Sequence, residues 1–329
     1  MTFIRTVLGD IAPEELGVTY SHEHLVIDGG RPVLLEPEFD LADVEAMAIE
    51  VNEAVGFGLR SVVDAMPCDA GRNAAMLAGI ARRTAIHVVA PTGLHHDRYY
   101  GPAHWSHRVS VEELADLFTA DIRDGIDAYD YAGPVVRRTP FRAGVIKVAG
   151  SEDGLSPRDA RIFEAAAETH RRTGAPILTH CEHGTAALEQ VRFLGDRGVS
   201  PGHIVLSHVD RIVDRGYHRE LLETGAFGEY DGSFRWVDGE PNGTVQLIGW
   251  MAEEGLDDRI VVGMDAALRR YYHVHGGEPG LMWLLDGFTR LLADAGLDEA
   301  VRQRLFVSNP ARAFAFPFAP SVAPPSPVT

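Results

Sequence analysis

The chain has 329 residues, with 30 lysines and arginines against 48 aspartates and glutamates, and therefore a formal net charge of −18. This acidic excess would repel a nucleic-acid backbone, so it argues against nucleic acid as a partner and favours a small-molecule substrate. The two cysteines, Cys68 and Cys181, are too few for a disulfide framework in a chain of this length. No apolar run is long enough to span a membrane and no secretion signal opens the chain, so we expect a cytoplasmic protein without membrane contact.

Short runs rich in β-branched residues, each bounded by turn residues, predict eight strands along the chain. They cover residues 18–24, 60–66, 86–93, 143–150, 175–181, 202–208, 226–231 and 259–265. Helical patterns alternate with them and cover residues 41–55, 74–83, 111–126, 157–172, 186–197, 243–254 and 279–295. Ser110 and Ser156 stand directly before two of these patterns and are predicted helix N-caps.

This alternation, with strands that read as continuous apolar runs, favours an α/β fold whose parallel sheet is covered on both sides. Eight strands are the number that closes a (β/α)8 TIM barrel. The rival open sheet is less favoured, because no Gly-x-Gly-x-x-Gly motif follows a strand and opens a helix. We expect a single domain over residues 1–315 and an extended or disordered Pro-rich tail over 316–329, of which Phe316 and Phe318 could pack on the barrel base.

Hydrophilic side chains end five of the otherwise apolar strands. They are His22 and His24 on the first strand, and then Lys147, His180, His208 and Asp265. Residues two apart in a strand point to the same side, so both imidazoles of the first strand would face the barrel mouth. A single histidine at a strand end is more often structural, but lysine and aspartate are rarely buried unless they are paired. The joint pattern therefore predicts one functional site at the carboxyl ends of the strands.

A pair of divalent cations would supply the positive charge that holds such groups together. Imidazole and carboxylate ligands suit zinc best, although manganese and cobalt accept the same ligands. A protonated lysine would be an unfavourable neighbour for two cations. Lys147 fits the site as a carbamate formed from its neutral amine and carbon dioxide, with two oxygens that can bridge both metals.

The segments TVLGDIAPEELGVTYSHEHL, GVIKVAGSEDGLSP, PILTHCEHGT, IVLSHVDR and GMDAALRRYY resemble the phosphotriesterase family of the amidohydrolase superfamily. The resemblance extends to about Pro310. It implies a barrel in which His22, His24 and Asp265 hold one metal, and His180 and His208 hold the other. Carbamylated Lys147 and a hydroxide would bridge the two metals, and the family also implies a homodimer.

The same resemblance implies the mechanism. The bridging hydroxide would attack a substrate carbonyl whose oxygen the second metal polarises, and Asp265 would receive the proton as general base. Several family members carry a further carboxylate three residues after the sixth-strand histidine. Here that position is Arg211, with Asp210 one residue earlier, which leaves the onward proton relay open.

The loops after the last two strands bear on the substrate. Their arginines and tyrosines suit a phosphate group, and the run DAALRRYYHVHGGEPG is similar to the family branch that hydrolyses phosphorylated sugar lactones. That similarity implies phosphate contacts from Arg235, Arg269 and Tyr272. Alternatively, these arginines form loop ion pairs with Glu229, Asp231 or Glu240. Tyr99 and Tyr100 either line the opposite wall of the pocket or serve only in packing.

The leading hypothesis is thus a metal-dependent hydrolase that opens a lactone ring, in particular that of a phosphorylated sugar lactone. A phosphotriesterase or an acyl-homoserine lactonase is the alternative within the same chemistry, with an apolar pocket from Trp105, Phe234 and Trp236. A non-catalytic metal-containing binding protein is the alternative from another class. A serine or cysteine hydrolase is disfavoured, because the chain has no Gly-x-Ser-x-Gly motif and Cys181 is expected to point away from the barrel axis.

Overall fold

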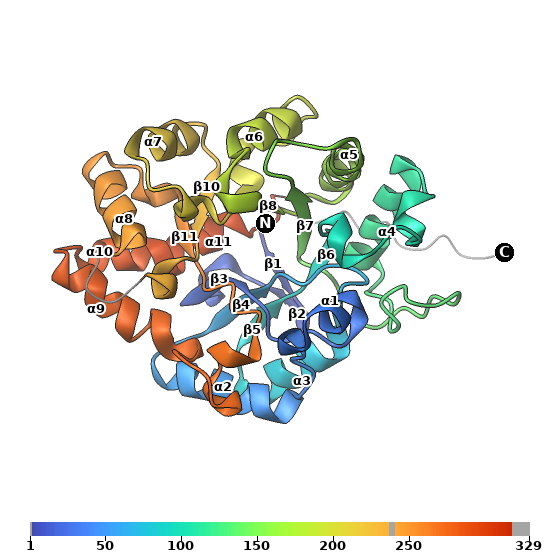
Figure 1. The fold of residues 1–329 in the computed structure, drawn as a ribbon, viewed down its shortest axis with the longest axis horizontal. Coiled ribbons are helices and arrows are strands. Elements are labelled where there is room, and N and C mark those ends of the chain that lie inside the picture. Colours follow the sequence, from blue (N-terminus) through green and yellow to red (C-terminus); the bar gives the residue numbers. More distant parts are fainter. Residues whose placement is uncertain (1, 237–240, 318–329) are drawn as a thin grey trace.

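The computed structural model describes residues 2–236 and 241–317, and its centre is a barrel of parallel strands enclosed by helices (Figure 1). The strands are β3 (Thr19–Glu23), β4 (Ser61–Asp64), β5 (His87–Val89), β6 (Pro91–Leu94), β7 (Val145–Gly150), β8 (Ile177–Cys181), β9 (Ile204–Ser207), β10 (Phe227–Tyr230) and β11 (Ile260–Val262). β5 and β6 are consecutive pieces of one strand, interrupted at Ala90. All the predicted strands are therefore confirmed.

Backbone pairing shows that these strands form a closed barrel. The order is β3-β4-β5 in one sheet and β6 through β11 in the other, with parallel neighbours throughout. The last strand returns to the first, since the backbone N–H of Asp265 donates to the carbonyl of His22 at 3.0 Å. The predicted (β/α)8 TIM barrel is confirmed.

The helices outside the barrel largely follow the predicted pattern. α2 (Val44–Gly56), α3 (Ala74–Thr84), α4 (Val111–Arg123), α5 (Pro157–Thr173), α6 (Ala187–Gly195) and α8 (Gly243–Glu253) lie where they were expected. Ser110 and Ser156 are confirmed as N-caps, because their hydroxyls accept from the backbone N–H of Glu113 and Asp159 at 3.2 Å. Within the residues that the structure describes, no helix has the length and apolar composition required to cross a membrane.

Several helices were not predicted. α7 (Arg215–Glu223) covers the barrel after β9. It has nine mostly polar residues and buries only His218, Leu221 and Leu222, so the segment is short and offers few apolar positions to indicate a helix. The predicted helix 279–295 is instead a short turn, Leu281–Leu284, followed by α9 (Gly287–Asp294). Short segments add α1 (Gly30–Leu35), α10 (Glu299–Gln303) and α11 (Asn309–Ala313).

A two-stranded hairpin, β1 (Ile4–Thr6) with β2 (Gly9–Ile11), also escaped prediction. It brings the beginning of the chain to Phe316, which pairs with Phe3 in a backbone bridge. The two rings stack with their centroids 4.8 Å apart, and Phe316 is fully buried. The first residue of the predicted tail is therefore packed against the body of the protein, whereas residues 318–329, which include Phe318, lie outside the described residues.

The interior of the barrel is filled near the amino ends of the strands. An apolar cluster there contains one inward side chain from most strands: Val63, Val89, Val145, Leu178, Val205, Phe227 and Val261. Ile4, Phe314 and Ala315 join this cluster. Since side chains alternate along a strand, the next inward positions lie two and four residues further on, toward the carboxyl ends. On β7, β8, β9 and β10 the position two residues further on is polar: Lys147, His180, Ser207 and Glu229.

Candidate metal centre

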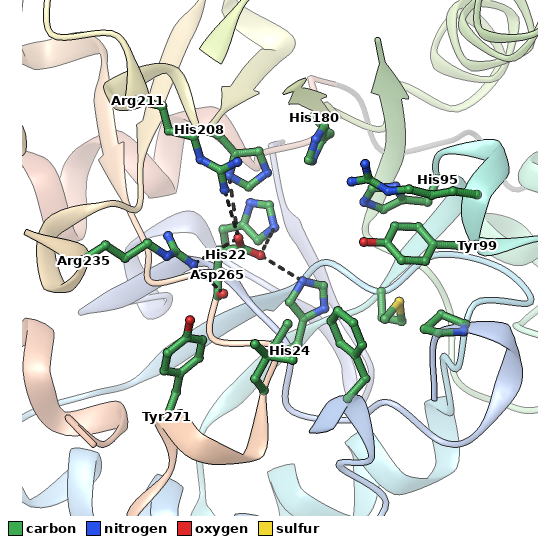
Figure 2. A pocket seen from close by; sticks show the side chains of 16 residues that line it. His22, His24, His95, Tyr99, His180, His208, Arg211, Arg235, Asp265 and Tyr271 are labelled. Carbon is green, nitrogen blue, oxygen red and sulfur yellow. Dashed lines mark hydrogen bonds and ion pairs between the residues drawn. The ribbon is translucent and has the colours of Figure 1, made fainter. Parts of the chain in front are cut away.

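The polar inward positions gather at the mouth of the barrel. Lys147 follows Val145 on β7, His180 follows Leu178 on β8, and Glu229 follows Phe227 on β10, each after two residues. A pocket opens above them, and the side chains that line it include His22, His24, His180, His208 and Asp265 (Figure 2). The structure thus brings together the side chains that were predicted to hold metals, while their role as ligands stays a prediction.

Distances within this cluster suit metal coordination. The Nε2 atoms of His24 and His22 lie 3.3 Å and 3.6 Å from Oδ1 of Asp265. These three residues offer ligand atoms that all lie within 4.8 Å of one another. On the other side, the ring centroids of His180 and His208 are 4.4 Å apart. The arrangement agrees with the two ligand groups that the family resemblance implies.

Three of these histidines each have one ring nitrogen in contact with a different carboxylate. Glu229 Oε2 lies 3.2 Å from His22 Nδ1, and Asp231 Oδ2 lies 2.5 Å from His208 Nδ1. Glu182 Oε2 lies 2.7 Å from His180 Nε2. A carboxylate that accepts from one ring nitrogen fixes the tautomer and leaves a lone pair on the other nitrogen, as is usual for metal-bound histidine.

Burial lowers the pKa of His22, His180 and His208 and so favours the neutral imidazole, which is the form that binds a metal. Burial is the main reason that the pKa values of His22 and His180 lie well below the usual range. The positive charge of Lys147 lowers the pKa of His22 further, and His208 does the same for His180.

Lys147 is fully buried on β7 and has a single distant hydrogen-bond acceptor, Ser207 Oγ at 3.5 Å. Burial lowers the pKa of its amine to about 8, so much of the amine is uncharged in mildly alkaline solution. An uncharged amine is the form that can react with carbon dioxide. The position and protonation of Lys147 therefore fit a carbamate at the centre of the site.

The loop geometry at the barrel mouth holds Asp265 in an unusual backbone conformation. Asp265 has φ of +50° and His208 has φ of +66°, both in the left-handed region. Glu23 supports this turn, because its carboxylate accepts from the N–H groups of Met264 at 2.8 Å and Ala266 at 3.4 Å. Strained backbone of this kind persists where surrounding contacts fix it, and it is common at functional sites.

The charge of Asp265 is set by its neighbours. Burial alone would raise the pKa of its carboxyl group, but His208, His24 and His22 together hold it well below the usual range. Arg235 contributes as well, with Nη2 at 3.3 Å from Asp265 Oδ2. Asp265 is therefore ionised, as both a metal ligand and a proton acceptor must be.

Three guanidinium groups line the pocket above this cluster: Arg98, Arg211 and Arg235. Arg235, a predicted phosphate contact, also lies 3.3 Å from Asp231 Oδ1, so the alternative prediction of a loop ion pair is realised in the structure. Figure 2 shows Arg235 and Arg211 on the Asp265 side of the pocket and Tyr99 on the opposite side. Tyr99 lines the pocket as predicted.

The structure does not bring the other predicted substrate residues to this pocket. Tyr272 is fully buried, and its hydroxyl donates to the carbonyls of His24, at 2.9 Å, and Ala266. Its neighbour Tyr271 lines the pocket instead. Arg269 lies beside His275 in a separate surface cavity. Tyr100 is buried and donates to the carbonyl of Cys68 at 3.0 Å, which is the packing role that was left open for it.

Comparison with known proteins places this architecture in a family. The model of the phosphotriesterase family matches residues 2–314. The chain belongs to the phosphotriesterase family. Members of this family use a binuclear metal centre, and the described residues of this chain contain His, Asp and Glu clusters that could hold metal ions.

Individual relatives of this phosphotriesterase-family chain are similar over nearly their whole length. A phospho-furanose lactonase from Mycoplasmopsis synoviae is 32% identical, with 95% of this chain and 92% of the relative covered. The crystal structure of an amidohydrolase from Mycoplasma synoviae has a TM-score of 0.90 at 31% identity, covering 96% of this chain and 92% of that chain. That of a lactonase from Listeria monocytogenes has a TM-score of 0.87 at 29% identity, covering 95% and 99%.

The donor set of this phosphotriesterase-family protein fits a pair of cations. His24 Nδ1 is buried without a hydrogen-bond partner in the described residues, and so is Glu229 Oε1. Gly263 packs closely against Glu229, because a Cβ atom there would lie only 2.9 Å from Glu229 Oε1 and 2.8 Å from the His22 backbone. Neutral imidazoles, buried carboxylates and a weakly bound amine around one space are what divalent cations would require.

The sequence analysis did not identify the three carboxylates that contact histidines of the centre. Glu229 and Asp231 were weighed only as partners for arginines, and Glu182 was not considered. A signal for the first two was present, since Phe227, Glu229 and Asp231 alternate along one strand and must share the inward face. Glu182 stands in a loop beyond β8, where no periodicity indicates the direction of a side chain.

Proposed function

We propose that this protein is a metal-dependent hydrolase that opens the ring of a lactone, specifically a phosphorylated sugar lactone. The observation that carries the proposal is the coincidence of two features in one pocket. Its floor holds the cluster of His22, His24, His180, His208 and Asp265, and its walls carry three guanidinium groups. The phospho-furanose lactonase from Mycoplasmopsis synoviae supports the choice of substrate.

We propose two zinc ions in this centre, with carbamylated Lys147 as the ligand between them. Such a pair of cations supplies an activated water molecule and polarises the lactone carbonyl. His22, His24 and Asp265 would hold one ion, and His180 and His208 the other. Asp265 has the further task of receiving a proton, for which its ionised carboxylate at the open side of the cluster is suited.

The walls of the pocket position the substrate. Arg235 is held by two carboxylates, at 3.3 Å from Asp231 Oδ1 and 3.3 Å from Asp265 Oδ2, which orients its guanidinium toward the floor. Arg211 lies 3.4 Å from Asp265 Oδ2 and also faces the pocket. A phosphate group placed between these two side chains would receive charge-assisted hydrogen bonds from both. In this proposal Arg211 therefore replaces Arg269 as the second arginine that contacts the phosphate.

The test compares a five-carbon phosphosugar lactone with the same lactone lacking phosphate. In the parent protein, loss of the phosphate should reduce kcat/KM by a free energy of more than about 2 kcal/mol, since two charged contacts are lost. In Arg211→Met this preference should shrink while the two metals remain bound. Equal kcat/KM for both lactones in the parent would remove the phosphate from the proposal and leave a plain lactonase.

A phosphotriesterase or an acyl-homoserine lactonase is the second candidate, because Phe39, Met66 and Leu268 make part of the pocket apolar. None of the three aromatic residues first expected to form it, Trp105, Phe234 and Trp236, lines this pocket. The Phe234 ring packs against Tyr271, with centroids 5.0 Å apart. The indole N–H groups of Trp105 and Trp236 donate to Asp69 at 2.9 Å and to Thr244 at 3.2 Å, outside the pocket lining. A homodimer and a cytoplasmic location stay predictions.

A further inference from the structure

Glu182 occupies a junction between the metal centre and a neighbouring loop. It follows Cys181 directly at the end of β8, two residues after His180. Its Oε2 lies 2.7 Å from His180 Nε2 and 3.0 Å from His96 Nε2. Its Oε1 lies 3.1 Å from Arg98 Nη1. One carboxylate therefore contacts a predicted metal ligand and two side chains from the segment after β6.

Glu182 differs from the other two carboxylates that contact histidines of the centre. Glu229 and Asp231 extend from β10 inside the barrel, and their side chains are completely buried. The side chain of Glu182 comes from the loop after β8 and is 16% exposed. The rings of His95, His96 and His180 pack around it with centroids 4.7 to 5.1 Å apart.

The loop that Glu182 contacts forms one wall of the substrate pocket. Arg98 and Tyr99 both line this pocket, and the Arg98 guanidinium lies over the Tyr99 ring at 5.1 Å from its centroid. Arg98 has two hydrogen bonds to Glu182, at 3.1 Å and 3.3 Å. The carboxylate that contacts His180 therefore also holds Arg98, which is part of this wall.

We propose that Glu182 is a positioning residue that links His180 to the pocket wall. By accepting from His180 Nε2, it leaves Nδ1 as the nitrogen that faces the cation. Through His96 and Arg98, the same carboxylate holds the segment of Arg98 and Tyr99 against the metal centre. The inference rests on the proposed function only in taking the cluster to bind metals, and it does not depend on which ester or lactone is hydrolysed.

The chemistry of the side chain explains why glutamate is needed here. A carboxylate has two oxygens that accept only, so it can accept from His180 and Arg98 together while it lies 3.0 Å from His96 Nε2. A glutamine would present an amide N–H₂ group to one of these donors. The nearby Arg98 guanidinium also argues against Glu182 as a ligand of an additional cation, because that cation would lie beside a permanent positive charge.

The experiment measures metal affinity in the metal-loaded protein by competition with a chelator, using zinc as the probe. Glu182→Gln should weaken one of the two bound zinc ions by about 10- to 100-fold and leave the other unchanged, as expected when the partner of a ligating histidine is lost. Glu182→Asp keeps the carboxylate and should recover part of that affinity. Glu152→Gln is the matched control, since this exposed glutamate is 4.0 Å from its nearest cationic side chain, His183.

A separate variant distinguishes the contact of Glu182 with His180 from its contact with Arg98 in the pocket wall. Arg98→Met removes only the contact to the pocket wall and should retain both zinc ions with parental affinity, whereas Glu182→Gln should not. The proposal is overturned if Glu182→Gln retains both ions as tightly as Glu152→Gln, or if it loses both together with a large fall in melting temperature. If the parent binds two zinc ions but opens no lactone, the proposed function fails while this test still decides the role of Glu182.

Discussion

His208 Nδ1 lies 2.5 Å from Asp231 Oδ2, and both side chains are buried at the mouth of the barrel. His208 itself has φ of +66°, so the backbone alone would not favour this placement. The contact with Asp231 keeps the imidazole in one orientation and one tautomer before any cation binds.

Removing the charge of Asp231 should weaken the metal centre. In Asp231→Asn, the amide can still occupy the space but no longer provides a negative charge to His208. We expect zinc affinity to fall by about 10- to 100-fold, which chelator competition would measure. Asp153→Asn, at an exposed position, is the control and should bind as the parent does. Parental zinc affinity in Asp231→Asn would show that the contact has no part in metal binding.

Metal uptake by the metal-free protein should depend on pH and on bicarbonate. The pKa of Lys147 is lowered to about 8, so the reactive neutral amine increases as the pH rises through that value. Reconstitution with zinc should therefore be faster at pH 9 than at pH 6.5, and added bicarbonate should accelerate it. Lys147→Met should hold fewer than two zinc ions and show no response to bicarbonate. A bicarbonate effect of equal size in this variant would contradict carbamylation of Lys147.

Tyr272→Phe should affect stability more than substrate binding. The Tyr272 hydroxyl donates to the carbonyls of His24 and Ala266 in a fully buried position. Its removal deprives these buried carbonyls of the hydroxyl proton that they share and should lower the free energy of unfolding by about 1 to 3 kcal/mol, measured by denaturant titration. KM for a phosphorylated lactone should stay at the parental value. A large rise in KM with unchanged stability would restore Tyr272 as a phosphate contact.

His218 should make the protein less stable in acid. Burial lowers its pKa to about 4, and its ring contacts the Tyr230 hydroxyl at 2.6 Å and the Ile212 carbonyl at 2.8 Å. Because the unfolded state takes up a proton near pH 6.5 and the folded state only near pH 4, stability is lost as the pH falls between these values. The loss should be about 3 kcal/mol from this residue. His218→Gln should show a shallower fall in unfolding free energy across the same range, and an identical slope would contradict this origin.

The fold could be predicted in detail where local signals agree with the tertiary structure. Ser110 and Ser156 mark their helices because a capping box depends only on neighbouring residues. The strands were found because both of their faces are buried and apolar. α7 escaped because its buried face is short and includes His218, and the β1–β2 hairpin because its pairing with the rest of the protein is not local.

The strand residues that form the floor of the candidate site could be predicted from the sequence. The loop residues that form its walls could not. Strand alternation fixes the direction of Lys147 and His180, so their convergence follows from the barrel itself. In the loops, no such period relates one side chain to the next. Tyr271 and Tyr272 are adjacent, yet one lines the pocket and the other is buried against backbone carbonyls. Arg269 likewise faces a different cavity from Arg235.

The bridge between Phe3 and Phe316 joins the first and last strand-like segments that the structure describes. The backbone between these residues therefore returns almost to its starting point, on the face of the barrel away from the reactive floor. A circularly permuted version could connect this pair by a short linker and open the chain in the exposed stretch around Val135 and Val136. Such a rearranged chain should retain the cluster of histidines, because none of its strands would be interrupted.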